Sequence, residues 1–184
     1  MVYAPDRRAP ELSLLPVKLR GAHTLALGGT LAAEIVEESD RFAPKETGGI
    51  LLGYRYAETR VAQLVELVGA GPGARRESHR FSPDGAWQSK TIAERYERSG
   101  RTLEYLGDWH SHPKNVGPSA LDRVTARRIA KAPAARCPHP IFLIAIFAEG
   151  EWELRAYRYT TRRLRRIELR CEKQSMILNR LGRW

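Results

Sequence analysis

Two histidines stand two residues apart at the end of an apolar run, in the stretch Trp109-His110-Ser111-His112-Pro113. Residues at positions i and i+2 of a β-strand project from the same face, so His110 and His112 can both reach one metal ion. A histidine on a strand is more often an ordinary core residue than a ligand. The pair alone therefore leaves both interpretations open.

A carboxylate follows the histidines after a short return, in Pro118-Ser119-Ala120-Leu121-Asp122. Ser119 and Asp122 have the spacing of a capping box that starts a helix. A carboxylate in the first helical turn can also reach an ion held by the preceding strand. Two imidazoles and one carboxylate leave a fourth tetrahedral position for water, which is the arrangement of a catalytic zinc site. Cys137 and Cys171 lack the paired spacing of a structural zinc site.

Glu46 precedes Thr47-Gly48-Gly49 and an apolar run, far upstream of the histidines. The two glycines permit close backbone approach, so Glu46 can lie at the rim of a site. A carboxylate there can take a proton from water and pass it to a leaving amine. The alternative is an ordinary carboxylate in a turn. Asp108 shares the strand parity of His110; it either orients that histidine as an outer partner or is a solvated or core-edge carboxylate.

The combination Glu-Thr-Gly-Gly-Ile-Leu-Leu-Gly, Trp-His-Ser-His-Pro and Pro-Ser-x-x-Asp resembles the JAMM, or MPN-plus, motif of the JAB/Mov34 metalloproteases. The resemblance implies an MPN fold and the activity of a zinc isopeptidase that removes ubiquitin or ubiquitin-like proteins. It assigns His110, His112 and Asp122 to one zinc ion. It assigns Glu46 to the role of general base and acid, and Ser119 to stabilising the oxyanion.

The spacing departs from the family pattern at one place. Nine residues, Pro113 to Leu121, separate the second histidine from the aspartate, where the family commonly has ten. We expect the ligands to converge through a tighter turn. The compact chain resembles the bacterial branch of the family, found beside ubiquitin-like, E1-like and E2-like proteins and in antiphage defence. A JAB peptidase that trims a sulfur-carrier protein is an alternative with the same site.

The elements that must position these residues alternate between helical and strand patterns, which predicts an α/β chain of the α+β type. We expect one domain with a central, curved, mostly antiparallel sheet flanked by helices. Residues 1–15 form an N-terminal extension, 16–160 the catalytic domain and 161–184 a basic C-terminal segment. The predicted strands cover residues 17–27, 50–56, 61–68, 103–112, 141–148 and 151–159, with a short extended piece at 78–81. The predicted helices cover residues 31–42, 84–99 and 119–131.

Aromatic and histidine residues without a proposed role in the site are assigned to the core or to the surface. Trp87, Trp109 and Tyr96 are expected in the core, whereas His79 and His139 are expected in surface loops.

The chain has a formal net charge of +10, and its basic residues are concentrated near the C-terminus. Such a field favours acidic partners of any kind. The segment is either a solvated end of the domain with Leu164, Ile167, Leu169, Ile177 and Leu178 packed inward, or a surface on which Arg163, Arg165 and Arg166 grip an acidic partner. A nucleic-acid-binding module is a rival function, but no interleaving of aromatic and basic residues supports it.

The longest apolar run, Ile141 to Ala148, is too short to span a membrane, which needs about 20 apolar residues. The N-terminus lacks the pattern of a signal peptide, and two cysteines do not make a disulfide framework. We therefore expect a cytoplasmic protein without a membrane partner.

Overall fold

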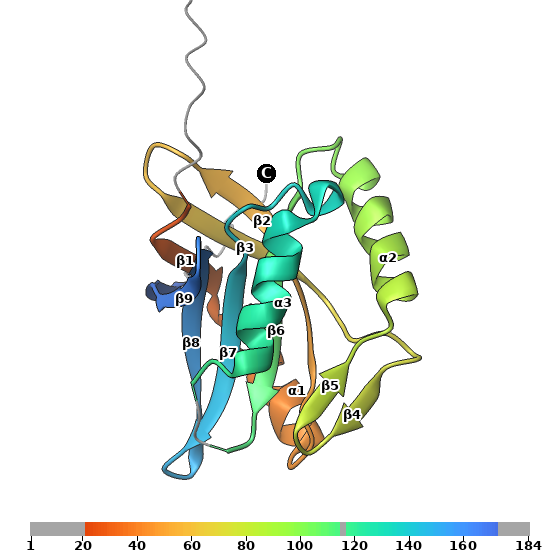
Figure 1. Cartoon of the computed structure of the whole chain (residues 1–184), viewed down its shortest axis with the longest axis vertical. Helices are drawn as coiled ribbons and strands as arrows, with labels where there is room; N and C mark the ends of the chain where they lie inside the picture. Colours follow the sequence, from red (N-terminus) through yellow and green to blue (C-terminus); the bar gives the residue numbers. More distant parts are fainter. Residues whose placement is uncertain (1–20, 115–116, 173–184) are drawn as a thin grey trace, which may run out of the picture.

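A curved sheet of eight strands forms the frame of the protein (Figure 1). The structure is a computed structural model and describes residues 21–114 and 117–172. The strands are β1 (Thr24–Gly28), β2 (Gly48–Tyr56), β3 (Val61–Val68), β4 (Arg75–Glu77), β5 (Arg80–Ser82), β6 (Glu104–His112), β7 (Ile141–Ala148), β8 (Glu151–Thr160), β9 (Arg163–Arg166) and β10 (Glu168–Glu172). The helices are α1 (Gly29–Phe42), α2 (Gly85–Arg98), α3 (Ala120–Lys131) and the short 3-10 helix η1 (Pro133–Ala135).

The sheet has the order β10-β1-β3-β2-β6-β7-β8-β9, and β4 pairs only with β5 in a separate hairpin. In the large sheet, β2–β3, β2–β6, β7–β8 and β8–β9 are antiparallel, whereas β1–β10, β1–β3 and β6–β7 are parallel. The sheet is therefore mixed, with antiparallel pairs only slightly ahead.

The two edge strands of this sheet, β9 and β10, lie close together, because only one residue, Ile167, connects them in the chain. The Ile167 N–H donates to the carbonyl of Ala156 on β8, and the next N–H, of Glu168, donates to His23 beside β1. A single residue can bridge the edge strands only if the sheet is strongly curved, as predicted.

The three long helices divide between the two faces of the sheet. On one face, Leu31 and Ile35 of α1 pack against the largest core cluster, which includes Trp109. On the other face, Ile92 of α2 packs over β2 and β3, and Ala126 of α3 packs over β7 and β8. The central strand β6 runs between the areas covered by α2 and α3 (Figure 1).

Most predicted elements are present, with shifted ends. The first strand begins at residue 24, whereas residues 21–23 were also expected in it. Residues 17–20, the rest of that prediction, lie outside the described residues. The expected turn at Gly28-Gly29 is absent because α1 begins at Gly29 directly after β1. Ser78 and His79 form the turn of the β4–β5 hairpin instead of an extended piece.

The prediction that α2 buries Trp87 in the core is wrong. Trp87 is 38% exposed, and Ala86 and Ala93 are exposed as well, whereas Trp109 is buried as predicted. The buried residue of α2 is Gln88, whose amide donates to the Gly69 carbonyl at 2.9 Å. An interior hydrogen bond thus replaces apolar packing at this end of the helix.

The basic C-terminal segment contributes β9 and β10 to the sheet. Leu164, Ile167 and Leu169 pack against the core, whereas Ile177 and Leu178 lie outside the described residues. The division at residues 15 and 160 stays a prediction. Among the residues that the structure describes, no helix is long and apolar enough to cross a membrane.

Candidate metal centre

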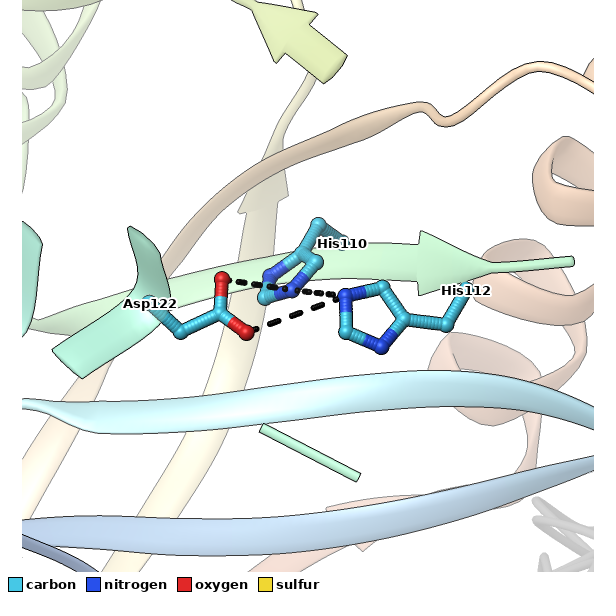
Figure 2. Close-up of side chains that lie close together, drawn as sticks. All are labelled: His110, His112 and Asp122. Carbon is cyan, nitrogen blue, oxygen red and sulfur yellow. Dashed lines mark hydrogen bonds and ion pairs between the residues drawn. The ribbon is translucent and has the colours of Figure 1, made fainter. Parts of the chain in front are cut away.

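The two histidine side chains at the end of β6 point toward one another and toward Asp122 (Figure 2). His110 Nε2 and His112 Nε2 are 3.0 Å apart, and both rings are largely buried. β6 is held between β2 and β7, with His110 opposite Gly48 on one side and Ile144 on the other. The strand geometry therefore presents two imidazole nitrogens to one point.

Asp122 reaches the same point from the first turn of α3. Its Oδ1 is 3.2 Å from His110 Nε2, and its Oδ2 is 3.7 Å from His112 Nε2. The side chain is fixed by a complete capping box, in which the Ser119 N–H donates to Asp122 Oδ2 at 2.6 Å and the Asp122 N–H donates to Ser119 Oγ at 3.1 Å. Asp122 therefore takes part in the capping box of α3 and lies next to both histidines at the same time.

The three donor groups fit a tetrahedral metal ion. One atom from each residue can be chosen so that all lie within 4.8 Å of one another. Around zinc, with ligand bonds of about 2.0–2.1 Å, neighbouring donor atoms of a tetrahedron are roughly 3.3–3.4 Å apart. The two histidine nitrogens are 3.0 Å apart, Asp122 Oδ1 is 3.2 Å from His110 Nε2, and the other carboxylate oxygen, Oδ2, is 3.7 Å from His112 Nε2, so these separations lie on both sides of that value. Two imidazoles and a carboxylate would leave one position for water or substrate.

The Asp122 carboxylate is stabilised in its charged form. Burial raises its pKa, but the hydrogen bonds and charge of His110 and the hydrogen bonds of Ser119 outweigh burial and hold the pKa well below its ordinary value. The group therefore stays ionised at neutral pH, as a metal ligand must.

Glu46 lies on the segment that enters β2. Its own N–H donates to the carbonyl of Glu77 on β4 at 2.9 Å. It lines a cavity of about 180 Å³ together with His110 and Asp122. Burial raises the pKa of Glu46, partly offset by the charge of His110. A half-buried carboxylate with a raised pKa beside a metal site is suited to accept and return a proton.

Gly48 and Gly49 are required by close backbone approach, as predicted. A Cβ on Gly48 would lie 2.3 Å from the Trp109 carbonyl oxygen, and a Cβ on Gly49 would lie 2.2 Å from the Val68 carbonyl oxygen. Both contacts are impossible for a real side chain. The glycines therefore bring the Glu46 segment against the histidine strand.

Further anchors of this segment were not identified from the sequence. The Thr47 N–H donates to Ser111 Oγ at 3.0 Å, and the Ser111 N–H donates to the Thr47 carbonyl at 2.8 Å. Thr47 Oγ1 donates to Glu38 of α1 at 2.8 Å and accepts from Arg76 of β4 at 3.0 Å. Strand alternation does place Ser111 on the face of β6 that points away from the histidines. Its hydrogen-bond partner, Thr47, belongs to a segment distant in the sequence, which no local pattern reveals.

Asp108 lines the same cavity as Glu46 and His110. Its Oδ1 accepts a hydrogen bond of 2.6 Å from the Tyr105 hydroxyl. Burial raises the pKa of Asp108 despite this hydrogen bond and the nearby charges of His110 and Arg128. An orienting role for Asp108 toward His110 stays a prediction.

The remaining predicted residues, Ser119 and the three arginines of β9, are not among the residues that line this cavity. Ser119 is the N-cap of α3, so its hydroxyl already has a structural role. Arg163, Arg165 and Arg166 are exposed on the edge strand β9, and Arg166 lies 3.4 Å from Glu153. The structure does not bring these arginines to the metal centre.

Comparison with known proteins agrees with this geometry. The family described as prokaryotic homologs of the JAB domain matches residues 30–159. A probable metalloprotease of Sinorhizobium fredii is 34% identical over 120 residues, covering 64% of this chain and 73% of the relative. A Vibrio cholerae protein named CD-NTase/cGAS isopeptidase is 36% identical over 84 residues, covering 45% of this chain and 53% of the relative.

A solved structure shows the same fold. The solution structure of a protein from Desulfitobacterium hafniense superposes with a TM-score of 0.63 at 18% identity, covering 82% of this chain and 94% of that one. The family match spans the candidate metal-binding cluster and most of the sheet. The chain therefore belongs to the prokaryotic JAB-domain family, and it is a metalloprotease of the JAMM type.

Proposed function

We propose that this protein is a zinc-dependent isopeptidase that hydrolyses the bond after the C-terminal glycine of a ubiquitin-like protein. It would release that protein from target lysines or process its precursor. The observation that carries the proposal is the convergence of His110, His112 and Asp122, with Glu46 lining the same cavity as His110 and Asp122.

Each residue has a distinct task in this reaction. His110, His112 and Asp122 would hold a zinc ion, which acts as a Lewis acid on the scissile carbonyl and makes water a nucleophile near neutral pH. Glu46 accepts the proton of the attacking water and then donates it to the departing lysine amine. Because Glu46 moves a proton and forms no bond to carbon, the reaction has no acyl-enzyme intermediate.

Ser119 would stabilise the oxyanion in this proposal. Its Oγ accepts from the Asp122 N–H, so the hydroxyl hydrogen is available to a developing negative charge. Asp108 would orient the ligand histidine His110. Arg163, Arg165 and Arg166 would grip an acidic partner on β9, at a distance from the reaction.

The substrate class follows from the relatives as a proposal. The Vibrio cholerae relative is named for isopeptidase action on CD-NTase/cGAS proteins, and the present chain spans 53% of its length. A ubiquitin-like protein, or a CD-NTase attached through its C-terminal residue, is therefore the substrate that we propose. E1-like and E2-like proteins of the same bacterial operon, with a role in antiphage defence, and a cytoplasmic location belong to the same proposal.

The test uses purified full-length protein freed of metal by a chelator and then reloaded with one equivalent of zinc. Two substrates are compared: the ubiquitin-like protein linked to a lysine side chain, and the same protein with a C-terminal extension. Zinc-dependent release from lysine, lost in His112→Ala, supports the isopeptidase. Cleavage of only the extension would indicate a trimming peptidase of the sulfur-carrier type, and equal activity without metal would refute the proposal.

A further inference from the structure

Basic side chains gather at the end of the sheet where β1, β3 and β7 begin. We call Arg60, Arg158 and Arg165 the arginine cluster; they lie before β3, on β8 and on β9. Arg60 Nη2 donates to the Gly21 carbonyl at 3.5 Å and contacts His23 Nε2. Arg158 donates to the same carbonyl and lies directly opposite Arg165 in the β8–β9 pair. Residues from four separate segments therefore bring positive charge to one place.

Backbone carbonyls hold Arg158 in position. Its Nη1 donates to the carbonyls of Gly21 and Ala22, the second at 2.5 Å. A Cβ on Gly21 would lie 2.7 Å from Arg158 Cδ and 2.9 Å from His139 Cβ, so the chain passes close to both side chains. The guanidinium is thus oriented by neutral groups, which do not compensate its charge.

No carboxylate balances the arginine cluster within the part of the chain that the structure describes. The ion pairs found there involve other basic residues. Glu168 is adjacent, since its N–H donates to the His23 carbonyl at 3.0 Å. Its carboxylate, however, accepts from Thr24 at 2.8 Å and from Arg170 at 3.2 Å. The positive charge of the cluster is therefore available to an anion from outside.

Two donor groups of the cluster also lack an acceptor. Nε of Arg60 and Nε of Arg158 are shielded from solvent and form no hydrogen bond with any described residue. A buried donor without an acceptor is costly, and its presence in a native fold indicates a bound water or ion. The arrangement is therefore completed by a ligand that supplies oxygen atoms.

The cluster is unfavourable for the fold in the absence of an anion. Like charges directly opposite each other in a sheet, as in Arg158 and Arg165, destabilise the strand pair. Burial and the charges of Arg60 and Arg165 lower the pKa of Arg158. Arg60 also has a φ of +58°, in the left-handed region that favours glycine. A bound anion would relieve the repulsion among these groups.

The cluster is separate from the metal centre. Arg158 pairs with Ile141 at the beginning of β7, whereas His112 pairs with Ile146, five residues further along that strand. Five residues of a strand span roughly 16 Å at about 3.3 Å per residue. Arg158 also has the strand parity of Ala156, which packs with α1, whereas α3 on the other face lines the metal cavity. An anion at the cluster therefore lies outside the active site.

The number and type of donors specify the anion. Guanidinium groups match the oxygen atoms of phosphate in a bidentate manner, and a phosphoryl group carries about two negative charges at neutral pH. A carboxylate would leave most of the charge of three arginines unbalanced. Arg60 and Arg158 are half-buried, whereas His23 and Arg165 are exposed, so a ligand can enter from solvent. The donors surround one peptide carbonyl instead of forming an extended stripe, which favours a small ligand over a nucleic acid.

We propose that the arginine cluster is a binding site for the phosphoryl group of a small molecule, either a phosphate ester or a diphosphate, with His23 as a further donor. The inference does not depend on the proposed function, because none of these residues lines the metal cavity. Arg165 also belongs to the β9 arginines proposed to grip an acidic partner, so the tests use Arg60 and Arg158.

Calorimetric titration of the zinc-loaded full chain with pyrophosphate tests the site. We expect one pyrophosphate per chain and a Kd at least tenfold weaker in Arg158→Gln, because the substitution removes charge-assisted hydrogen bonds. Arg127→Gln is the matched control, since Arg127 is exposed on α3 and the substitution removes the same charge. Its Kd should equal that of the wild type. Equal affinity in Arg158→Gln would overturn the proposal.

Arg60→Gly separates ligand binding from a structural role. Glycine accepts a φ of +58°, so the Tm of the ligand-free protein should not fall. The increase in Tm that pyrophosphate causes in the wild type should be lost. A lower Tm with unchanged pyrophosphate affinity would mean that the arginine cluster serves the fold alone, and it would refute the site.

Two further outcomes would assign the anion elsewhere and refute the site. Pyrophosphate binding that is lost in His112→Ala but kept in Arg158→Gln would place the anion on the metal. Binding of a short single-stranded oligonucleotide without any binding of pyrophosphate would indicate a nucleic-acid surface. Loss of pyrophosphate binding in Arg158→Gln, with retention in His112→Ala, supports the phosphoryl site whether or not the protein is an isopeptidase.

Discussion

Replacing Ser111 by Ala is expected to weaken both the fold and the reaction, although Ser111 points away from the metal. Its Oγ is the acceptor of the Thr47 N–H at 3.0 Å, and both residues are fully buried. A buried donor that loses its acceptor costs about 1–3 kcal/mol. For a chain of this size, 1 kcal/mol lowers Tm by roughly 2–4 °C, so we expect a decrease of roughly 2–12 °C.

The same substitution loosens the segment that carries Glu46, the residue before Thr47. A misplacement of a catalytic group by about 1 Å can cost up to about 100-fold in rate. We therefore expect kcat to fall at least tenfold while zinc affinity changes little, because His110 and His112 keep their places between β2 and β7.

Thermal unfolding, zinc titration and steady-state kinetics on one preparation measure these effects. Ser89→Ala is the matched control, because Ser89 is exposed and its hydroxyl bonds only to Gly85 within α2. Its Tm and kcat should be unchanged. If Ser111→Ala behaves like this control, the Thr47–Ser111 pair does not position Glu46.

Three further predictions concern the glycines, the aspartate and the basic strand. Gly49→Ala places a Cβ 2.2 Å from a backbone oxygen and should destabilise by about 1–3 kcal/mol in urea denaturation, whereas Gly69→Ala, with nothing within 4 Å, should not. In metal-free protein, Asp122→Asn should cost about 1 kcal/mol at pH 6. Because the folded-state pKa of Asp122 is lowered, this difference should shrink as pH falls below about 4; a constant difference would contradict the assignment. Charge reversal at Arg163, Arg165 and Arg166 should raise KM in a salt-dependent way and leave kcat unchanged, and an unchanged KM would refute partner binding there.

Local patterns are sufficient for much of the fold. The β2–β3 hairpin, the buried strand β7 and the helix α3 were predicted because each has a clear period and a definite start or end. β9 and β10 were not predicted, since their many arginines mask a pattern in which only Leu164, Ile167 and Leu169 face the core. Their pairing at opposite edges of the sheet depends on its curvature, which is a global property.

The packing of α2 shows why amphipathic spacing is an incomplete guide. Trp87 and Ala93 have helical spacing with other apolar residues, yet both are exposed. Ala93 lines a cavity at α2 instead of packing into the core. The candidate metal ligands His110, His112 and Asp122 could be predicted from the sequence because their spacing and side-chain chemistry are diagnostic. The anchors of Glu46 are not, since Ser111, Arg76 and Glu38 act through contacts between segments distant in the sequence.

The most direct test of the account is zinc content and turnover measured together in Glu46→Gln. The substitution keeps the size of the side chain and removes the proton acceptor, while the proposed ligands His110, His112 and Asp122 are untouched. We expect one bound zinc with wild-type affinity and a loss of kcat of about 10²–10⁴-fold. Near-wild-type turnover with zinc bound would contradict the assignment of Glu46 as the base. If the variant and the wild type are both folded but neither binds zinc, that result would contradict the metal centre itself.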